Sequence, residues 1–201
     1  MKAKTLEGML AAESGMQADM VTRFQRLREF NLLRRARGRN AEFLDADEVV
    51  SGLLSMVASR PGFAAVTASG LRRLKPVGNL EEAFAKSGSL AQALARALED
   101  EETVKTVKHV RLGDSDSNTR CATSAEIAYD EEGTLRTTQY MPDTALTLFG
   151  PGKAEGFDRL SVNAAVQREL VITGRLLRKV ARAMRQAREA LAVAEQLSRA
   201  T

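Results

Sequence analysis

The chain has 201 residues, 44% of them hydrophobic, so it is long enough to bury a core in one large or two small domains. A single cysteine and a single histidine exclude an intrachain disulfide, a multi-cysteine zinc site and a two-histidine metal site. No apolar run approaches the ~20 residues that span a bilayer, and MKAKTLEGML lacks the core of a signal peptide. We therefore expect a cytoplasmic protein without membrane contact.

The N-terminal region predicts two helices joined by a tight turn. Apolar residues recur at helical spacing through residues 5–12. Gly15 tolerates the left-handed conformation that ends a helix, so a second helix is expected to start at Gln17 or Ala18. The predicted core-facing stripe of this second helix comprises Met20, Val21, Phe24, Leu27 and Phe30.

A basic segment follows the second helix. Residues 32–36 and 41–44 predict two short strands, and the loop between them contains Gly38 and Asn40, which tolerate positive φ. Seven arginines between positions 23 and 39 are opposed within that window only by Glu29, so the local field is expected to be more positive than the whole-chain charge of +4. A polyanion is the natural partner. These arginines are Arg23, Arg26, Arg28, Arg34, Arg35, Arg37 and Arg39.

Across residues 4–60, the order of turn, helix and basic hairpin resembles the winged helix-turn-helix of bacterial and phage transcriptional regulators. Three features are also similar to those of uncharacterised alphaproteobacterial mobile-element proteins: the pair Leu32-Leu33, the sequence RGRNA at 37–41 and the acidic start of the next helix. The resemblance implies that the second helix enters the major groove of double-stranded DNA, where Arg can read guanine, Gln adenine and Thr the thymine methyl. The basic hairpin would contact phosphates or the minor groove. The predicted DNA-binding residues are Gln17, Thr22, Arg23, Arg26, Arg34, Arg35, Arg37, Arg39 and Asn40.

Helical patterns continue to about residue 102. Asp45 is a predicted N-cap, with acidic residues in the first turn that follows it. This third helix is expected to end at residues 59–62, and further helices are predicted at 64–74 and at 90–100, the latter capped by Ser89. We interpret the helices at 64–74 and 90–100 as structural elements that pack in the core. The buried stripe predicted for the third helix is Val49, Val50, Leu53, Leu54 and Val57.

From Thr103 the hydrophobic period changes to two. Strands are predicted at 103–112, 120–129 and 134–140, forming an antiparallel meander with a hairpin loop at 130–133, and a further strand is expected at 158–165.

Residues 166–199 predict a long amphipathic helix, whose regular part is expected to start after Gly174 because glycine costs roughly 1 kcal/mol inside a helix. Its seven-residue repeat has two interpretations: a dimerisation seam, or a cover over the chain's own sheet. The predicted oligomerisation residues are Leu177, Val180, Met184 and Leu191.

No catalytic, metal or cofactor site is predicted. His109 with Asp114 and Ser115 lacks a glycine-flanked nucleophile elbow, so a plain strand histidine is favoured. The acidic loop at 114–118 lacks the glycine and terminal glutamate of a calcium-binding EF-hand and is interpreted as a turn. Cys121 is interpreted as a small, semi-buried strand residue.

Together these patterns predict an α+β protein. It would comprise a winged helix-turn-helix at 1–60, a helical connector at 61–102, and an α+β domain at 103–201 with an antiparallel sheet and a C-terminal oligomerisation helix. The predicted function is sequence-specific binding of double-stranded DNA by a homodimeric transcriptional regulator that acts by occupying an operator; no effector is predicted. The alternatives are a packaging component similar to a small terminase subunit, a partition component, or an adaptor that binds protein. An enzyme is the least expected class.

Overall fold

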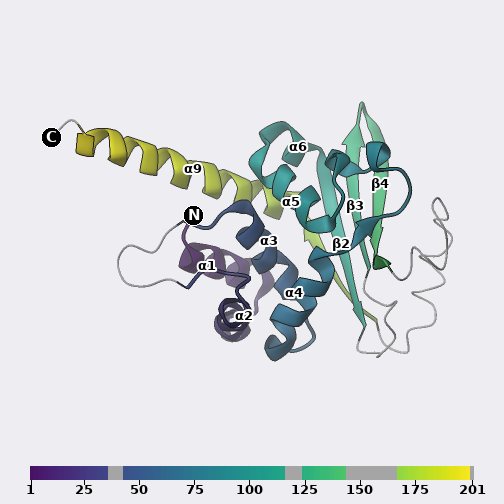
Figure 1. Cartoon of the computed structure of the whole chain (residues 1–201), viewed down its shortest axis with the longest axis horizontal. Coiled ribbons are helices and arrows are strands. Elements are labelled where there is room, and N and C mark those ends of the chain that lie inside the picture. Colours follow the sequence, from purple (N-terminus) through teal and green to yellow (C-terminus); the bar gives the residue numbers. More distant parts are fainter. Residues whose placement is uncertain (36–42, 116–123, 144–166, 200–201) are drawn as a thin grey trace.

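The computed structural model describes residues 1–35, 43–115, 124–143 and 167–199. This part of the chain forms seven α-helices and one five-stranded antiparallel sheet, so the predicted α+β class is confirmed. Figure 1 shows the helices gathered on one side of the sheet. The α-helices are α1 (Ala3–Ser14), α2 (Gln17–Glu29), α3 (Ala46–Leu54), α4 (Ala64–Arg72), α5 (Leu90–Glu99), α6 (Glu101–Thr106) and α9 (Gly174–Arg199). The strands are β1 (Lys75–Pro76), β2 (Val107–Ser115), β3 (Ser124–Glu131), β4 (Thr134–Met141) and β5 (Gln167–Thr173). The short 3₁₀ helices are η1 (Ser55–Val57), η2 (Pro61–Phe63), η3 (Leu80–Glu82) and η4 (Phe84–Lys86).

The helix boundaries follow from capping residues that sequence already marks. Gly15 adopts φ 70°, and its N–H donates to the Ala11 carbonyl, which ends α1 and lets α2 begin at Gln17. Asp45 forms a capping box with Glu48 at the start of α3. The Ser89 side chain accepts from the Gln92 N–H at the start of α5. These predictions are confirmed.

The sheet has the order β1-β4-β3-β2-β5. The predicted β2-β3-β4 meander is confirmed, and Glu132 and Gly133 take positive φ at the tip of its hairpin. Residues 103–106 were expected to begin the first strand, but they belong to α6. Asp100 explains the difference, since its carboxylate accepts from the N–H groups of Glu102 and Thr103 and so caps a short helix.

The predicted long C-terminal helix begins later than its pattern indicates. Residues 167–173 form β5, which pairs with β2 along seven residue pairs from His109↔Thr173 to Ser115↔Gln167. The helix α9 starts at Gly174, where an added Cβ would lie 2.0 Å from the Val107 carbonyl oxygen. Only glycine permits so close an approach between the start of α9 and the backbone of β2. The strand predicted at 158–165 lies outside the described residues.

One continuous core joins α1, α2 and α3 to the sheet and to the first half of α9. Leu177, Val180 and Met184 are at most 1% exposed because they fill the space beside α6 and β2. Their predicted place in an oligomer seam is therefore wrong: the cover interpretation holds for this half of the helix. Leu191, the fourth predicted seam residue, is 42% exposed.

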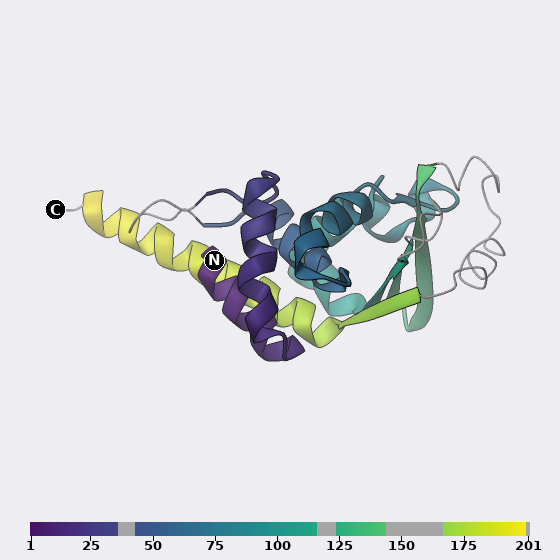
Figure 2. The same ribbon diagram turned by 90° about the horizontal axis from the view of Figure 1, so that it is seen from below.

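The second half of α9 extends away from the rest of the described chain. Both views show its C-terminal end projecting beyond the other helices (Figures 1 and 2), and every residue from 188 to 198 is exposed. None of the described helices is both long and apolar enough to cross a membrane.

Candidate nucleic-acid interface

Helix α2 has a narrower buried stripe than predicted. Met20, Phe24 and Leu27 are fully buried, at spacings of four and three residues, whereas Val21 and Phe30 are 59% and 54% exposed. The predicted burial of these last two side chains is wrong. Val21 lies to one side of the stripe, because successive helical residues are rotated by about 100°, and Phe30 follows the last residue of α2.

One outward face of α2 is uncharged over its first turns, and Asp19, with 48% of its side chain exposed, lies on the flank of this face. Its exposed side chains are spaced at i, i+1, i+4, i+5 and i+8, which places them together on one side of the helix. They combine amide and hydroxyl groups with methyl groups, and Gln17 and Thr22 of the predicted site are among them. The members of this face are Gln17, Ala18, Val21, Thr22 and Gln25.

Arg23 lies on the opposite, buried side of α2, with 1% of its surface exposed. Its Nη1 donates to the Ser55 carbonyl at 2.7 Å, and its Nη2 donates to the Ala58 carbonyl at 3.1 Å. Carbonyls at the end of a helix lack intrahelical donors, so a guanidinium supplies the hydrogen bonds they need. Its prediction as a DNA contact is therefore wrong: Arg23 connects α2 to the end of η1.

Arg34 is also engaged within the chain. Its Nε donates to both carboxylate oxygens of Glu48, at 2.9 and 2.8 Å, and its Nη2 donates to Asp45 at 3.1 Å. The Arg34 N–H also donates to Glu48, at 2.7 Å. These bonds hold the segment after α2 against the start of α3. The predicted role of Arg34 in DNA binding does not fit this arrangement.

The basic field around α2 is weaker than the sequence window indicates. Arg26 lies 2.6 Å from Glu29, and Arg28 lies 4.0 Å from Glu7 on α1. The hydrogen bond from Arg26, followed by that from Gln25, lowers the pKa of Glu29. Because Glu7, Asp45 and Glu48 come from outside the window, counting charge along the sequence missed them. Arg26 and Arg35 remain exposed cations at the outer surface.

The predicted wing is only partly within the described residues. Its flanks, residues 32–35 and 43–44, are not in strands. Instead, Leu33 and Leu44 are buried, at 1% and 3% exposure, and hold both ends of the segment in the core. The predicted contacts Arg37, Arg39 and Asn40 lie outside the described residues.

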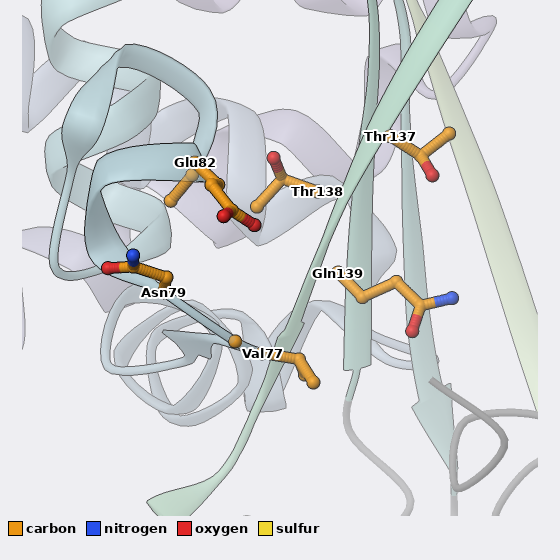
Figure 3. A pocket seen from close by; sticks show the side chains of 8 residues that line it. Val77, Asn79, Glu82, Thr137, Thr138 and Gln139 are labelled. Carbon is orange, nitrogen blue, oxygen red and sulfur yellow. The ribbon is translucent and has the colours of Figure 1, made fainter. Parts of the chain in front are cut away.

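A pocket of about 270 Å³ lies beside β4. Figure 3 shows Thr138 on the side facing Asn79 and Glu82, whereas Thr137 and Gln139 point to the other side of the strand. The Thr138 hydroxyl is occupied structurally, since it accepts from the Phe84 N–H at 2.9 Å. The polar groups that line this pocket therefore do not converge on one point, as a catalytic site requires.

The other residues considered for chemistry form no centre in the described part of the chain. His109 is on β2, with Nε2 3.8 Å from Glu126. No group of three or more His, Cys, Asp or Glu side chains that could hold a metal ion occurs among the described residues. The described residues do not include Cys121 or the rest of the acidic loop, and the structure does not describe the side chains of Asp114 and Ser115.

The spacing within α2 would have revealed the true orientation of Arg23. It lies three residues after Met20 and four before Leu27, so it shares their face. The same test places Ala18, Val21 and Gln25 outward.

Comparisons with known proteins add nothing to this assignment: no family model, no curated protein and no solved structure matches the chain.

Proposed function

We propose that this chain is a sequence-specific double-stranded DNA-binding regulator that acts by operator occupancy, with α2 as its reading helix. The observation that carries the proposal is the exposed, uncharged face at the N-terminal turns of α2, directly after the tight turn at Gly15. In helix-turn-helix proteins the N-terminal residues of the second helix meet base edges. The helical pair here presents such residues and leaves them unburied.

The chemistry of this face favours adenine–thymine pairs. Gln17 and Gln25 each offer an amide that can bond adenine bidentately, and Thr22 offers a hydroxyl and a methyl. The apolar surface of Val21 suits the thymine methyl. Gln25 donates to Glu29 at 3.1 Å in the free protein, so this exposed hydrogen bond would be exchanged for one to a base.

Affinity would come from phosphate contacts around this face. Arg26 and Arg35 are exposed, and the basic residues Arg37 and Arg39 and the polar residue Asn40 follow in sequence. The buried bonds of Arg23 to Ser55 and Ala58 support the same function indirectly, because they fix α2 on the core and so preorganise the reading face.

The test is selection of a preferred duplex from a random pool, followed by affinity measurements at fixed salt. Replacing Gln17 and Gln25 with Ala should cut discrimination between preferred and random duplexes by about five- to 150-fold per lost base contact, since such a contact is worth ~1 to 3 kcal/mol. Gln196→Ala, on an exposed part of α9, is the matched control and should bind like the wild type. Equal affinity of the wild type for every duplex would reject sequence-specific reading.

A protein-binding adaptor is the second candidate, and one observation favours it. Val21 on α2, Phe30 directly after α2 and Phe63 on the adjacent η2 each expose more than half of their surface. Large apolar side chains exposed on neighbouring elements are typical of protein contact. If the chain binds no duplex at all, and replacing Val21 with Asp abolishes capture of a partner protein, the adaptor function replaces the DNA-binding one.

A further inference from the structure

The projecting half of α9 is amphipathic, and its large apolar side chains are exposed in the described part of the chain. Leu191, Val193 and Leu197 are 42%, 54% and 65% exposed, and every neighbour from 188 to 198 is exposed too. The helix continues unbroken from the buried half that ends at Met184. The apolar face therefore extends about 20 Å beyond the core, because an α-helix rises 1.5 Å per residue.

This face is continuous and narrow. Its residues recur at intervals of three and four, which puts them on one side of the helix, and alanines alternate with leucines along it. Arg188 and Glu195 border one flank, seven residues apart, whereas Glu189 and Gln196 lie on the opposite side of the helix. The residues of this seam are Ala190, Leu191, Ala194 and Leu197.

We propose that this seam binds the same seam of a second copy of the chain in an antiparallel helix pair. Setting Leu191 opposite the partner's Ala194 places each large side chain against a small one, which allows close approach. The same register sets Arg188 opposite the partner's Glu195, and the twofold axis repeats that ion pair. One alignment thus satisfies both packing and charge.

A parallel pair lacks this complementarity. In parallel pairs each flank faces the other flank of the partner, so Arg188 and Glu195 would meet the flank that carries Ala190 and Leu197. Nothing there offers an opposite charge. Arg188 already reaches Glu99 at 3.3 Å, but that pair is half exposed at both ends and is readily exchanged for the intermolecular one.

The pairing replaces the seam that the sequence predicted. Leu177, Val180 and Met184 are unavailable because the core already covers them, and Leu191 alone of the predicted set belongs to the new seam. Two helical segments of this length form a small interface, so we expect a dimer in the micromolar range. The inference does not depend on DNA binding, and the protein is tested without DNA.

Sedimentation of the full chain from about 1 to 200 µM measures the association, with micromolar affinity as the expectation. Leu191→Glu should weaken it by about tenfold or more, because a charge would enter the apolar seam. Glu189→Arg, which changes charge on the side away from the seam, is the matched control and should leave the Kd within about twofold.

A charge exchange tests the register. Arg188→Glu alone and Glu195→Arg alone should each be mainly monomeric, because like charges then face each other at both ends of the seam. Mixing the two variants should restore a dimer, since every facing pair is again of opposite sign. Circular dichroism verifies that each variant is folded.

Each possible result of these measurements either supports the helix pair or overturns it. A wild-type chain that stays monomeric at about 200 µM overturns the proposal. A dimer that Leu191→Glu does not weaken places the interface elsewhere and also overturns it. A mixture of the two charge variants that associates no better than either variant alone rejects the antiparallel register.

Discussion

The two largest fully buried side chains of the described residues, Arg23 and Tyr140, are both polar, and they lie in different layers. In the helical layer, the Arg23 guanidinium donates to the Ser55 and Ala58 carbonyls. In the sheet, the Tyr140 hydroxyl has no hydrogen-bond partner among the described residues, and burial raises the pKa of that hydroxyl. The same degree of burial thus serves two purposes: Arg23 connects elements, whereas Tyr140 fills volume.

The difference concerns what each side chain leaves behind when it is removed. Loss of Arg23 removes a hydrogen-bond donor from two buried carbonyls, whereas loss of the Tyr140 hydroxyl removes no hydrogen bond among the described residues. Burial alone therefore does not predict whether a substitution raises or lowers stability. The hydrogen-bond partners of the buried group do.

The largest effect is expected from Arg23→Ala. It removes both hydrogen bonds and leaves a void between α2 and η1, so the free energy of unfolding should fall by about 2 to 5 kcal/mol. Urea denaturation measures this loss. Arg26→Ala, one turn away on the exposed side, is the control and should change stability by less than about 0.5 kcal/mol. Comparable losses for the two arginines would contradict the burial of Arg23.

The next largest effect is expected at the junction between sheet and helix. Gly174→Ala places a Cβ 2.0 Å from the Val107 carbonyl oxygen and 3.0 Å from that of Lys108, so backbone must move. We expect a loss of about 1 to 3 kcal/mol, or more, in thermal or urea unfolding. Gly8→Ala in α1 is the control: nothing lies within 4 Å of its added Cβ, and it should stabilise by about 0.5 to 1 kcal/mol. If both variants stabilise the protein, the close approach is absent.

A smaller effect of opposite sign is expected from Tyr140→Phe. The Tyr140 hydroxyl is buried and has no hydrogen-bond partner among the described residues, so removing it relieves its desolvation cost and stability should rise by roughly 1 kcal/mol. Tyr129→Phe, whose ring packs on Phe84 with centroids 4.8 Å apart, serves for comparison in the same unfolding assay. A clear loss of stability in Tyr140→Phe would show that the hydroxyl has a partner after all.

The smallest effect concerns a surface contact between α1 and α9. A hydrogen bond from Lys179 at 2.6 Å lowers the pKa of Glu13, and Arg175 adds to the shift. A folded-state pKa below the unfolded value means that the contact stabilises the fold above about pH 4.3 and that this contribution is lost as pH falls through the folded pKa. Carboxyl chemical shifts followed by NMR should show the Glu13 pKa rising in Lys179→Met. No change would exclude this ion pair in solution.

Sequence predicted the elements that depend on local signals. The turn at Gly15, the caps at Asp45 and Ser89, and the hairpin before Gly133 each rest on residues within a few positions of one another. These signals act before any tertiary contact forms, so one sequence suffices to read them.

The parts that sequence did not predict depend on distant partners. β5 is a strand because β2, some 60 residues earlier, pairs with it, as in Arg111↔Val171. The acids that engage Arg34 lie 11 and 14 residues away. Along α9 the seven-residue repeat runs unchanged through the point where the core ends near Met184. Periodicity showed that the helix is amphipathic but could not show what covers each part of it.

The strand order also has a consequence for how the chain emerges from the ribosome. β2 lies between β3 and β5 in the sheet, but β5 and α9 are synthesised only after β4. Until residue 167 has been made, one side of β2 is an open edge, and open edges pair readily with other chains. The late segment therefore ends an aggregation-prone stage of synthesis. A nascent chain stalled after β4 should bind chaperones more strongly than one that has completed α9.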